Sequence, residues 1–167
     1  MTLRLILTRH AKSSWNHPGL GDHERPLNER GRESASAVGR WLKDKGYVPD
    51  LVLSSDSTRT RETWARIEAA LDSGAAVEWL GALYHAGAQS MLDVLQGAGN
   101  AGCVMMLGHN PGIGGFAEII VQHAPDHIRF FDYPTAATTV MEFDAADWRD
   151  VDWGMGEVKD FVIPREL

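Results

Sequence analysis

The 167 residues of the chain suffice for one folded domain of ordinary size and are too few for two. Hydrophobic residues make up 44% of the sequence and charged residues 23%, so we expect a packed core. The formal charge of −7 argues against a protein that binds nucleic acid or an anionic membrane, because both need a basic surface.

Apolar runs alternate with amphipathic stretches along the chain, which predicts an α/β fold. The expected strands cover residues 3–8, 51–53, 76–79 (at a sheet edge), 103–107, 138–143 and 158–163. The expected helices run from Asn28 to Gly46, through Trp64, Ile67 and Leu71 to about Gly74, over 89–95, and from Ile113 through Ile120 to a stop at Pro125. We predict a three-layer α/β/α sandwich with a mostly parallel central sheet.

The single cysteine, Cys103, lies in the apolar run 103–107, which predicts a buried and unreactive thiol. One cysteine excludes an intramolecular disulfide and a zinc site built from cysteines. The N-terminal stretch does not read as a signal peptide, and no window is long and apolar enough to span a bilayer. We therefore expect a cytoplasmic protein.

Polar clusters follow three of the expected strands, at residues 8–10, 54–59 and 108–112. In open α/β sheets, ligands bind at the carboxyl ends of strands, where helix N-termini also point. Two histidines and two arginines are thus expected to meet at one rim of the sheet. The long connection over residues 124–137 is expected to form a lip of this site.

Arg9 and Arg59 are suited to hold a phosphoryl group, because the planar guanidinium fork matches its oxygens and keeps its charge. A histidine between them, His10, should have a lowered pKa, since positive charge favours the neutral imidazole. The neutral ring is a nucleophile that needs no metal. The glycine-rich turn 108–115 should let the backbone approach the ligand, and it lacks the Gly-Lys-Ser/Thr ending of a nucleotide-binding loop.

The segment Leu7-Thr8-Arg9-His10-Ala11 resembles the Arg-His-Gly motif of the histidine phosphatase superfamily, which includes the cofactor-dependent phosphoglycerate mutases. Residues 22–31 are similar to the stretch that leads into the first helix of the family, and residues 55–63 fit its Ser-x-x-x-Arg-x-x-x-Thr element. Residues 108–113 and 133–136 resemble the small phosphohistidine phosphatase branch. The motifs keep their order over nearly the whole chain, so a single histidine phosphatase domain over residues 1–167 is expected.

The resemblance implies that His10 is the nucleophile and that Arg9, Arg59 and His109 hold the phosphoryl oxygens. It implies no cofactor and no metal. By analogy with the mutases, Asn16 is a candidate for a further phosphate contact, although a polar turn residue before Pro18 explains it equally well. Ala11 replaces the usual glycine of the motif, which we interpret as a variant of this branch.

The proton donor is left open by the sequence. Larger family members carry an acidic donor in an inserted segment or directly after the second histidine, where this chain has Asn110. Glu78, Tyr84 and His85 are the nearest alternatives. An alkoxide leaving group needs a general acid, whereas a protonated imidazole leaves readily. The sequence therefore predicts hydrolysis of phosphohistidine on a protein, through a covalent intermediate on His10.

Two other functions remain open, a phosphatase for small phosphate esters such as sugar phosphates and a non-catalytic phosphate-binding module. The expected partner is a phosphorylated carrier protein or a small phosphate ester, and the oligomeric state is not predicted. The less specific interpretation of Arg59 is a surface pair with Glu62. Lys12 and Arg25 could extend the positive rim, although solvated charges are the ordinary case. Residues 144–152 are expected to form a hairpin or loop with a solvated face. Trp15 is expected to pack in the core or at the rim.

Overall fold

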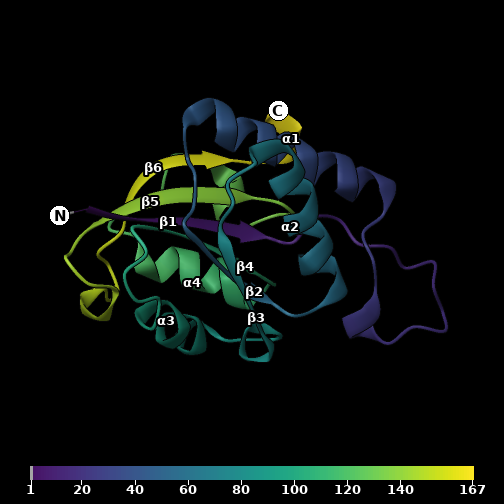
Figure 1. Cartoon of the computed structure of the whole chain (residues 1–167), viewed down its shortest axis with the longest axis horizontal. Coiled ribbons are helices and arrows are strands. Elements are labelled where there is room, and N and C mark those ends of the chain that lie inside the picture. The colour runs from purple at the N-terminus through teal and green to yellow at the C-terminus, as the bar shows by residue number, and fades with distance from the viewer. Residues whose placement is uncertain (1) are drawn as a thin grey trace.

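The computed structural model describes residues 2–167 and has a six-stranded sheet with helices on both faces (Figure 1). The strands are β1 (Thr2–Arg9), β2 (Leu51–Ser55), β3 (Ala76–Leu80), β4 (Cys103–Gly108), β5 (Thr138–Asp144) and β6 (Glu157–Val162). The helices are α1 (Glu29–Lys45), α2 (Thr58–Leu71), α3 (Ala88–Gln96) and α4 (Gly112–Ile120). Five short 3₁₀ turns are η1 (Asp22–Glu24), η2 (Gly81–Leu83), η3 (Ile128–Phe130), η4 (Trp148–Asp150) and η5 (Pro164–Glu166). The expected α/β sandwich is confirmed.

The sheet is mixed, with the strand order β3-β2-β4-β1-β5-β6. Strands β1 to β4 run parallel to one another, and β5 and β6 join as antiparallel partners. The expected edge position of β3 is confirmed. Because β1, β2 and β4 share one direction, their carboxyl ends meet at the same edge of the sheet, and the three polar clusters follow there.

Helices α1 and α2 cover one face of the sheet and α3 and α4 cover the other (Figure 1). The Asn28 side chain caps α1 by accepting from the Gly31 backbone N–H (2.8 Å), and Gly46 ends the helix with φ 75°. Successive residues of β1 point to opposite faces, so Ile6 packs with α1 and α2 whereas Leu5 packs with α3 and α4. Within the described residues, no helix is long and apolar enough to cross a membrane.

Two details of the fold go beyond what the sequence indicated. Helix α4 ends at Ile120, before Pro125, because the chain turns there to form a parallel bridge between Val121 and Gly156. The acidic stretch 144–152 has the expected solvated face, and on its other side Trp148 is fully buried and its indole N–H donates to the Ala101 carbonyl (2.6 Å). A single aromatic residue in a turn has no periodic pattern that would reveal this burial.

The expectation for Cys103 is confirmed, because its side chain is buried in β4. Burial raises the pKa of this thiol to about 12, so the thiolate form is absent at neutral pH. The cysteine therefore belongs to the core of the sheet.

Candidate active site

The register of the sheet brings the two histidines together. Strands β1 and β4 pair in parallel up to Arg9 and Gly108, so His10 and His109 leave the sheet side by side. Their ring centroids lie 5.2 Å apart. Arg59 reaches the same place from the first turn of α2, which follows β2.

These side chains line one pocket of about 340 Å³, which we call the central pocket. Its lining residues are Arg9, His10, Lys12, Ser13, Trp15, Arg25, Arg59, His85, His109, Asn110 and Thr135. The structure thus brings together four of the five residues expected from the sequence: Arg9, His10, Arg59 and His109. Four of the lining side chains are cationic and none is a carboxylate, so the pocket suits an anion.

The imidazole of His10 is held in one tautomer. Its Nδ1 lies 2.7 Å from the carbonyl oxygen of Ala11, and because a carbonyl can only accept, Nδ1 carries the proton. Nε2 then holds a free lone pair. Ala11 is itself buried, and its backbone N–H donates to Thr63 Oγ1 (3.0 Å) on α2. The turn after β1 therefore fixes the ring through its own backbone.

Close packing of α1 against this turn requires a glycine. A Cβ on Gly31 would lie only 2.0 Å from the Lys12 carbonyl oxygen. The Asn28 backbone N–H donates to the same oxygen (3.0 Å). The N-terminus of α1 thus supports the turn that carries His10.

His10 is uncharged at neutral pH, because burial lowers its pKa from 6.5 to about 3. The positive charges of the pocket act in the same direction, but they are smaller causes than burial, and the hydrogen bond to Ala11 opposes them. The predicted direction of the shift agrees with the structure. The predicted cause, the neighbouring arginines, is secondary, because only 6% of the His10 surface is exposed to water.

His109 shares this environment. Burial, followed by the charge of Arg59, lowers its pKa to about 3. Its Nε2 lies 2.8 Å from Ser55 Oγ at the end of β2, and the Ser57 backbone N–H donates to that hydroxyl oxygen (3.3 Å). The sequence did not single out Ser55 as a partner of His109, because the contact joins two different strand ends.

Arg9 is oriented by the lip of the pocket. Its Nη1 donates to the Tyr133 carbonyl oxygen (3.2 Å), and the Asn110 side chain donates to the same oxygen (3.0 Å). The backbone N–H of Ala136 donates to the carbonyls of both Arg9 and His10. The connection 124–137 therefore forms a lip through its last residues, as expected. Burial, followed by the charge of Arg59, lowers the pKa of Arg9.

Arg59 does not pair with Glu62, so that interpretation is wrong. Glu62 accepts a hydrogen bond from the Leu27 backbone N–H instead (2.8 Å). The Arg59 side chain is only 5% exposed and donates to the Asp22 carbonyl (2.7 Å) and to Asp22 Oδ2 (3.1 Å). It is a buried member of the pocket and not a surface charge.

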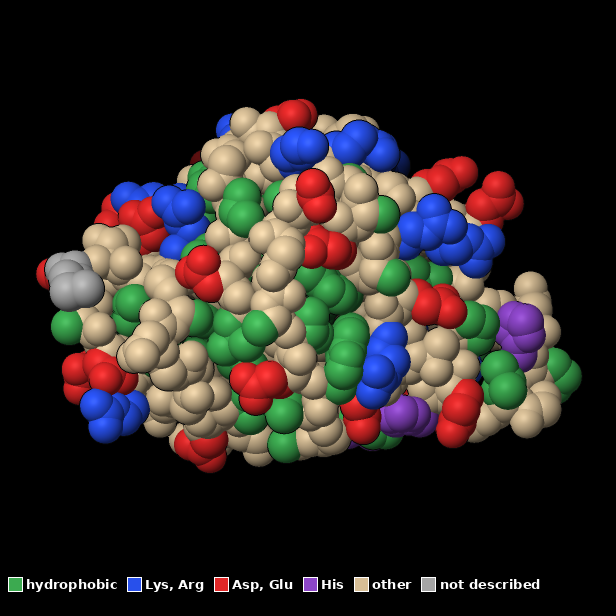
Figure 2. Space-filling view, in the orientation of Figure 1, with side chains coloured by type: hydrophobic (Ala, Val, Ile, Leu, Met, Phe, Trp, Pro, Cys, Tyr) green, Lys and Arg blue, Asp and Glu red, His purple; other side chains and the backbone are tan. Residues whose placement is uncertain are grey.

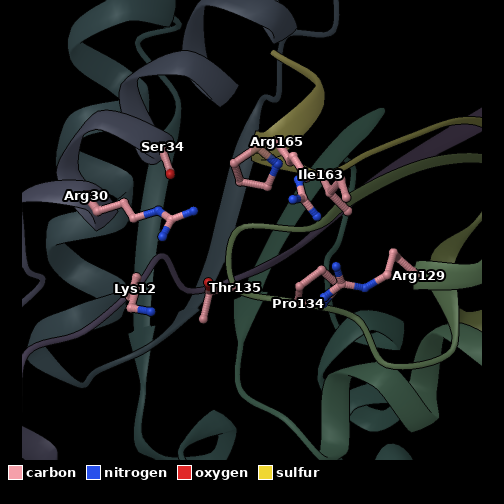
Figure 3. Close-up of a pocket in the computed structure, with 9 residues that line it drawn as sticks. Lys12, Arg30, Ser34, Arg129, Pro134, Thr135, Ile163 and Arg165 are labelled. Carbon is pink, nitrogen blue, oxygen red and sulfur yellow. The ribbon is translucent and has the colours of Figure 1, made fainter.

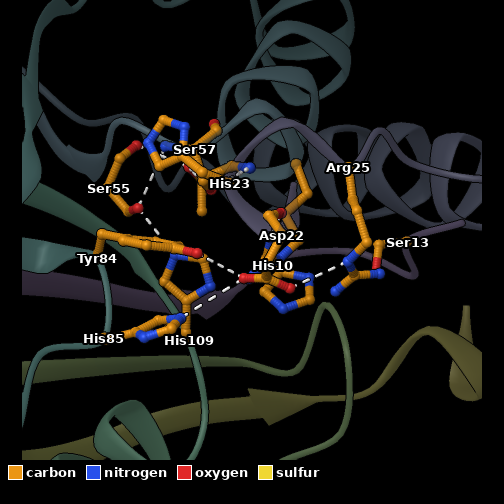
Figure 4. A network of polar contacts seen from close by, with 12 residues as sticks. His10, Ser13, Asp22, His23, Arg25, Ser55, Ser57, Tyr84, His85 and His109 are labelled. Atoms are coloured by element: carbon orange, nitrogen blue, oxygen red, sulfur yellow. Dashed lines mark hydrogen bonds and ion pairs between the residues drawn. The ribbon is translucent and has the colours of Figure 1, made fainter. Parts of the chain in front are cut away.

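Asp22 is a carboxylate at the site that the sequence did not identify as functional. Figure 4 shows it between Arg25, Tyr84 and His85. Tyr84 donates to its Oδ2 (2.5 Å), the Arg25 Nε donates to Oδ1 (3.1 Å), and the His85 Nε2 lies 3.5 Å from Oδ2. The hydrogen bond from Tyr84, with those from Arg25 and Arg59, holds the pKa of Asp22 well below its usual range. Its only sequence signal was its place in the family-like segment 22–31.

Arg25 is a third arginine of the pocket, so of its two expected roles the structure favours the extension of the positive rim over a solvated charge. It is 8% exposed, donates to Ser13 Oγ (2.8 Å), and its guanidinium carbon lies 3.5 Å from the centre of the Trp15 ring. Trp15 is 78% exposed, so it lies at the rim and not in the core. The ring and the guanidinium form a cation–π pair beside the pocket.

Asn16 does not line the central pocket, so the structure does not support a phosphate contact there. The residue is exposed, and its backbone N–H donates to Ser14 Oγ (3.1 Å). The reason is the path of the chain: Ser13 pairs with Leu27 in an isolated bridge, and the segment between them projects away from the sheet.

The three candidate proton donors differ in their distance from the central pocket. Glu78 lies exposed on the edge strand β3 and does not line the pocket. His85 lines the pocket, and the Tyr84 ring stacks on it with the two ring centroids 4.0 Å apart. His85 has a left-handed backbone with φ 58°, a conformation that costs a non-glycine residue about 1–2 kcal/mol. Such strain is frequent at functional sites, and here it turns the ring toward Asp22 and the pocket.

One glycine of the turn 108–115 is required by close packing. A Cβ on Gly112 would lie 1.9 Å from the Ala86 carbonyl oxygen. This glycine lets the loop that carries His85 press against the N-terminus of α4. Gly115 has no atom within 4 Å of its Cβ position, so space alone does not require it.

Three buried polar atoms lack a hydrogen-bond partner among the described residues: Arg9 Nε, Arg59 Nε and His109 Nδ1. Leaving a buried polar group without a partner costs about 1–3 kcal/mol. All three atoms belong to residues of the central pocket. Unpaired polar groups gathered at one place indicate a ligand that supplies the missing partners.

The part of the chain that the structure describes has no group of three His, Cys, Asp or Glu side chains placed to hold a metal ion. The polar groups of the pocket are instead mainly donors. Their natural ligand is an oxyanion.

Comparison with known proteins identifies a family that fits this geometry. A family model described as the histidine phosphatase superfamily, branch 1, matches residues 5–83. The crystal structure of a provisionally assigned phosphohistidine phosphatase, SixA from Agrobacterium tumefaciens, matches with a TM-score of 0.80 and 28% identity, covering 97% of this chain and 98% of that chain. The protein histidine phosphatase SixA complexed with tungstate has a TM-score of 0.81 at 19% identity, covering 98% of this chain and 99% of that one, which is a likeness of fold.

Relatives are also found by sequence. An uncharacterised protein of Mycobacterium tuberculosis is 29% identical over 163 residues, which are 94% of this chain and 99% of that protein. An uncharacterised chloroplast protein of Arabidopsis thaliana is 51% identical over 69 residues, or 41% of this chain. The matched segment spans only 32% of the Arabidopsis protein.

Proposed function

Because the chain belongs to the histidine phosphatase superfamily, in its small SixA-like branch, we propose that it hydrolyses phosphohistidine on a protein. The relatives support phosphatase activity in general. The single observation that carries the proposal is the state of His10: an uncharged imidazole with a free Nε2, in a pocket lined by four cationic side chains.

In the first proposed step, His10 Nε2 attacks phosphorus. The Nε2–P bond forms while the P–N bond of the substrate breaks, and the electron pair of that bond stays on the departing imidazole nitrogen. When the other nitrogen of the leaving ring is protonated, it departs as neutral imidazole. The Ala11 carbonyl accepts from Nδ1–H throughout, and this hydrogen bond strengthens as the ring becomes positive.

In the second proposed step, water attacks the phosphorus on His10. The O–P bond forms, the Nε2–P bond breaks with its electron pair returning to Nε2, and inorganic phosphate departs with loss of a proton to solvent. His10 returns to its neutral tautomer. Arg9 and Arg59 stabilise the equatorial oxygens in both steps, because their charge is fixed and little solvent reorganisation is needed.

His109 is proposed to donate a hydrogen bond to one phosphoryl oxygen. The Ser57 backbone N–H donates to Ser55 Oγ, which leaves the Ser55 hydroxyl proton free to be donated to His109 Nε2. The proton of the neutral ring then lies on Nδ1, the atom that has no partner within residues 2–167. Ser55 thereby acts as a positioning residue that sets the tautomer.

The nearest alternative is a phosphatase for small phosphate esters. An ester needs a proton donor for its alkoxide, and the observation in its favour is the place of His85 at the pocket rim. Replacing His85→Gln would slow ester hydrolysis far more than hydrolysis of phosphohistidine. The third possibility, a non-catalytic phosphate-binding module, predicts binding without turnover.

The proposal is tested by comparing kcat/KM on a phosphohistidine-bearing carrier protein and on sugar phosphates, each with and without EDTA. We expect the phosphohistidine protein to be the far better substrate and the chelator to leave its rate unchanged. A preference for the sugar phosphates would favour the alternative. Full inhibition by EDTA would contradict a metal-independent route.

A further inference from the structure

A second pocket lies directly beside the central pocket and shares Lys12 and Thr135 with it. It has a volume of about 270 Å³, and we call it the basic pocket. Four separate segments each contribute a cation: Lys12 from the turn after β1, Arg30 from α1, Arg129 from η3 and Arg165 from η5. Figure 3 shows the four charged groups directed toward a common hollow.

This concentration of positive charge contrasts with the composition of the chain as a whole, which has 16 Lys and Arg residues against 23 Asp and Glu. On the face shown in Figure 2, side chains of both signs are interspersed. No carboxylate lines the basic pocket. Among the described residues, Arg129 pairs with Asp132 (3.1 Å), whereas no carboxylate lies within 4.0 Å of the charged groups of Lys12, Arg30 or Arg165.

Several like charges that face one hollow repel one another, and an anion placed between them removes that repulsion. The hydroxyl groups of Ser34 and Thr135 line the same hollow and can donate further hydrogen bonds. The chemistry of the lining therefore selects a carboxylate or a phosphate group.

The position of Lys12 links this anion to the reaction. Lys12 follows His10 by two residues and lines both pockets. One extended substrate can therefore occupy the central pocket with its phosphoryl group and the basic pocket with another acidic group. A lone phosphoryl group in the central pocket would leave Arg30 and Arg165 without an anion.

We propose that the basic pocket binds a second anionic group, a carboxylate or a phosphate, carried by the same substrate molecule as the transferred phosphoryl group. On a phosphohistidine protein this group is an acidic side chain close to the phosphohistidine. The inference rests on the proposed function and adds the class of substrate, a molecule that carries a second anionic group besides the transferred phosphoryl group.

The test uses matched substrate pairs. Two phosphohistidine peptides differ only in flanking Asp or Asn residues, and two small phosphate esters differ only in the presence of a second anionic group. The wild type is expected to have a KM about tenfold lower for the acidic member of the preferred pair. In the double variant Arg30→Gln/Arg165→Gln this ratio should fall to about one, with kcat little changed, because each substitution replaces a charged guanidinium by an uncharged polar amide.

Arg40→Gln is the control, because it removes an exposed positive charge from the same helix α1 outside the pocket. It should keep the wild-type ratio. A lower KM for the acidic peptide than for its Asn counterpart identifies a protein substrate. A lower KM for the ester with the second anionic group identifies a small-molecule substrate. Both results support the proposal. Equal KM values within both pairs, or equal slowing of every substrate in the double variant, would overturn it.

Phosphoramidate separates this inference from the proposed function, because it carries a phosphoryl group on nitrogen and no second anionic group. If phosphoramidate is not hydrolysed, the proposed function fails. Whether the basic pocket binds an anion is then tested separately, by measuring the binding of a fluorescent acidic peptide through its fluorescence anisotropy. Binding that Arg30→Gln/Arg165→Gln abolishes and Arg40→Gln retains supports the pocket. Binding that is equal in all three proteins refutes it.

Discussion

His10 and His109 face each other at the end of the sheet with their ring centroids 5.2 Å apart, and both rings are held uncharged by burial. This pairing follows from the register of β1 against β4, in which Arg9 lies opposite Gly108. Two neutral imidazoles among fixed guanidinium charges give the pocket a nucleophile and a hydrogen-bond donor at neutral pH.

The buried histidines should make the fold sensitive to acid. Between pH 6.5 and about 3 an unfolded His10 binds a proton that the folded one does not, so stability falls as the pH drops through this window. Replacing His10→Gln should reduce the slope of unfolding free energy against pH, near pH 5, by about 1.4 kcal/mol per pH unit. Urea titrations from pH 4.5 to 7 measure this slope. His17→Gln, which removes an exposed histidine, is the control, and equal slopes in both variants would contradict the account.

Replacing Arg59→Lys should lower kcat/KM about 100-fold or more. Lysine keeps the charge, but it cannot donate to Asp22 and to a phosphoryl oxygen in the fixed geometry of a guanidinium. Steady-state kinetics on a phosphohistidine substrate measure the loss. Arg61→Lys, an exposed arginine of the same helix that donates to the Asp56 carbonyl, should stay close to the wild-type rate. Wild-type activity in Arg59→Lys would remove this residue from the phosphoryl site.

Replacing Ser55→Ala should lower kcat about tenfold with a smaller change in KM, because His109 loses the partner that sets its tautomer. The matched control is Ser54→Ala, which removes a neighbouring buried hydroxyl that donates to the Ser55 carbonyl and does not contact His109. If the two variants are equally impaired, the effect of Ser55 is structural.

Replacing Asp22→Asn should tighten inhibition by vanadate about three- to tenfold, because a negative charge beside Arg25 and Arg59 is removed while the shape is kept. Vanadate can mimic the five-coordinate phosphorus of the proposed steps. The inhibition constant is measured with wild type, Asp22→Asn and Asp56→Asn, in which the lost carboxylate pairs with His23 instead. Weaker inhibition of Asp22→Asn would show that the carboxylate mainly orders the arginines.

Replacing Asn16→Ala should change kcat/KM by less than about twofold, as is usual for an exposed residue away from buried contacts. The same kinetic assay serves here. A large rise in KM would mean that the segment between Ser13 and Leu27 folds over the pocket when substrate binds.

The order of strands and helices could be predicted because apolar periodicity and helix caps are local signals, as at Asn28 and Gly46. The residues that meet at the central pocket could also be placed, since Arg9 ends β1, His10 and His109 directly follow β1 and β4, and Arg59 lies in the first turn of the helix after β2. Their catalytic roles remain predictions. Local sequence patterns were therefore sufficient to predict the fold and the position of the site.

Other features depend on contacts between distant segments, which no local pattern reveals. Asp22 reaches Arg59 because the chain folds back at the Ser13–Leu27 bridge. Ser55 reaches His109 across two strands. The burial that lowers the pKa of His10 arises from packing of the whole sandwich. Because this burial is not visible in the sequence, the neighbouring arginines were predicted as the main cause of the pKa shift.

The central claim is that His10 carries the phosphoryl group between the two steps. Enzyme is mixed with labelled phosphohistidine substrate, quenched within one turnover, digested and mapped, with His10→Ala as the control. The account predicts one acid-labile, base-stable phosphoryl adduct on His10 that is absent from the variant. Turnover without such an adduct, or an adduct on another residue, would contradict it.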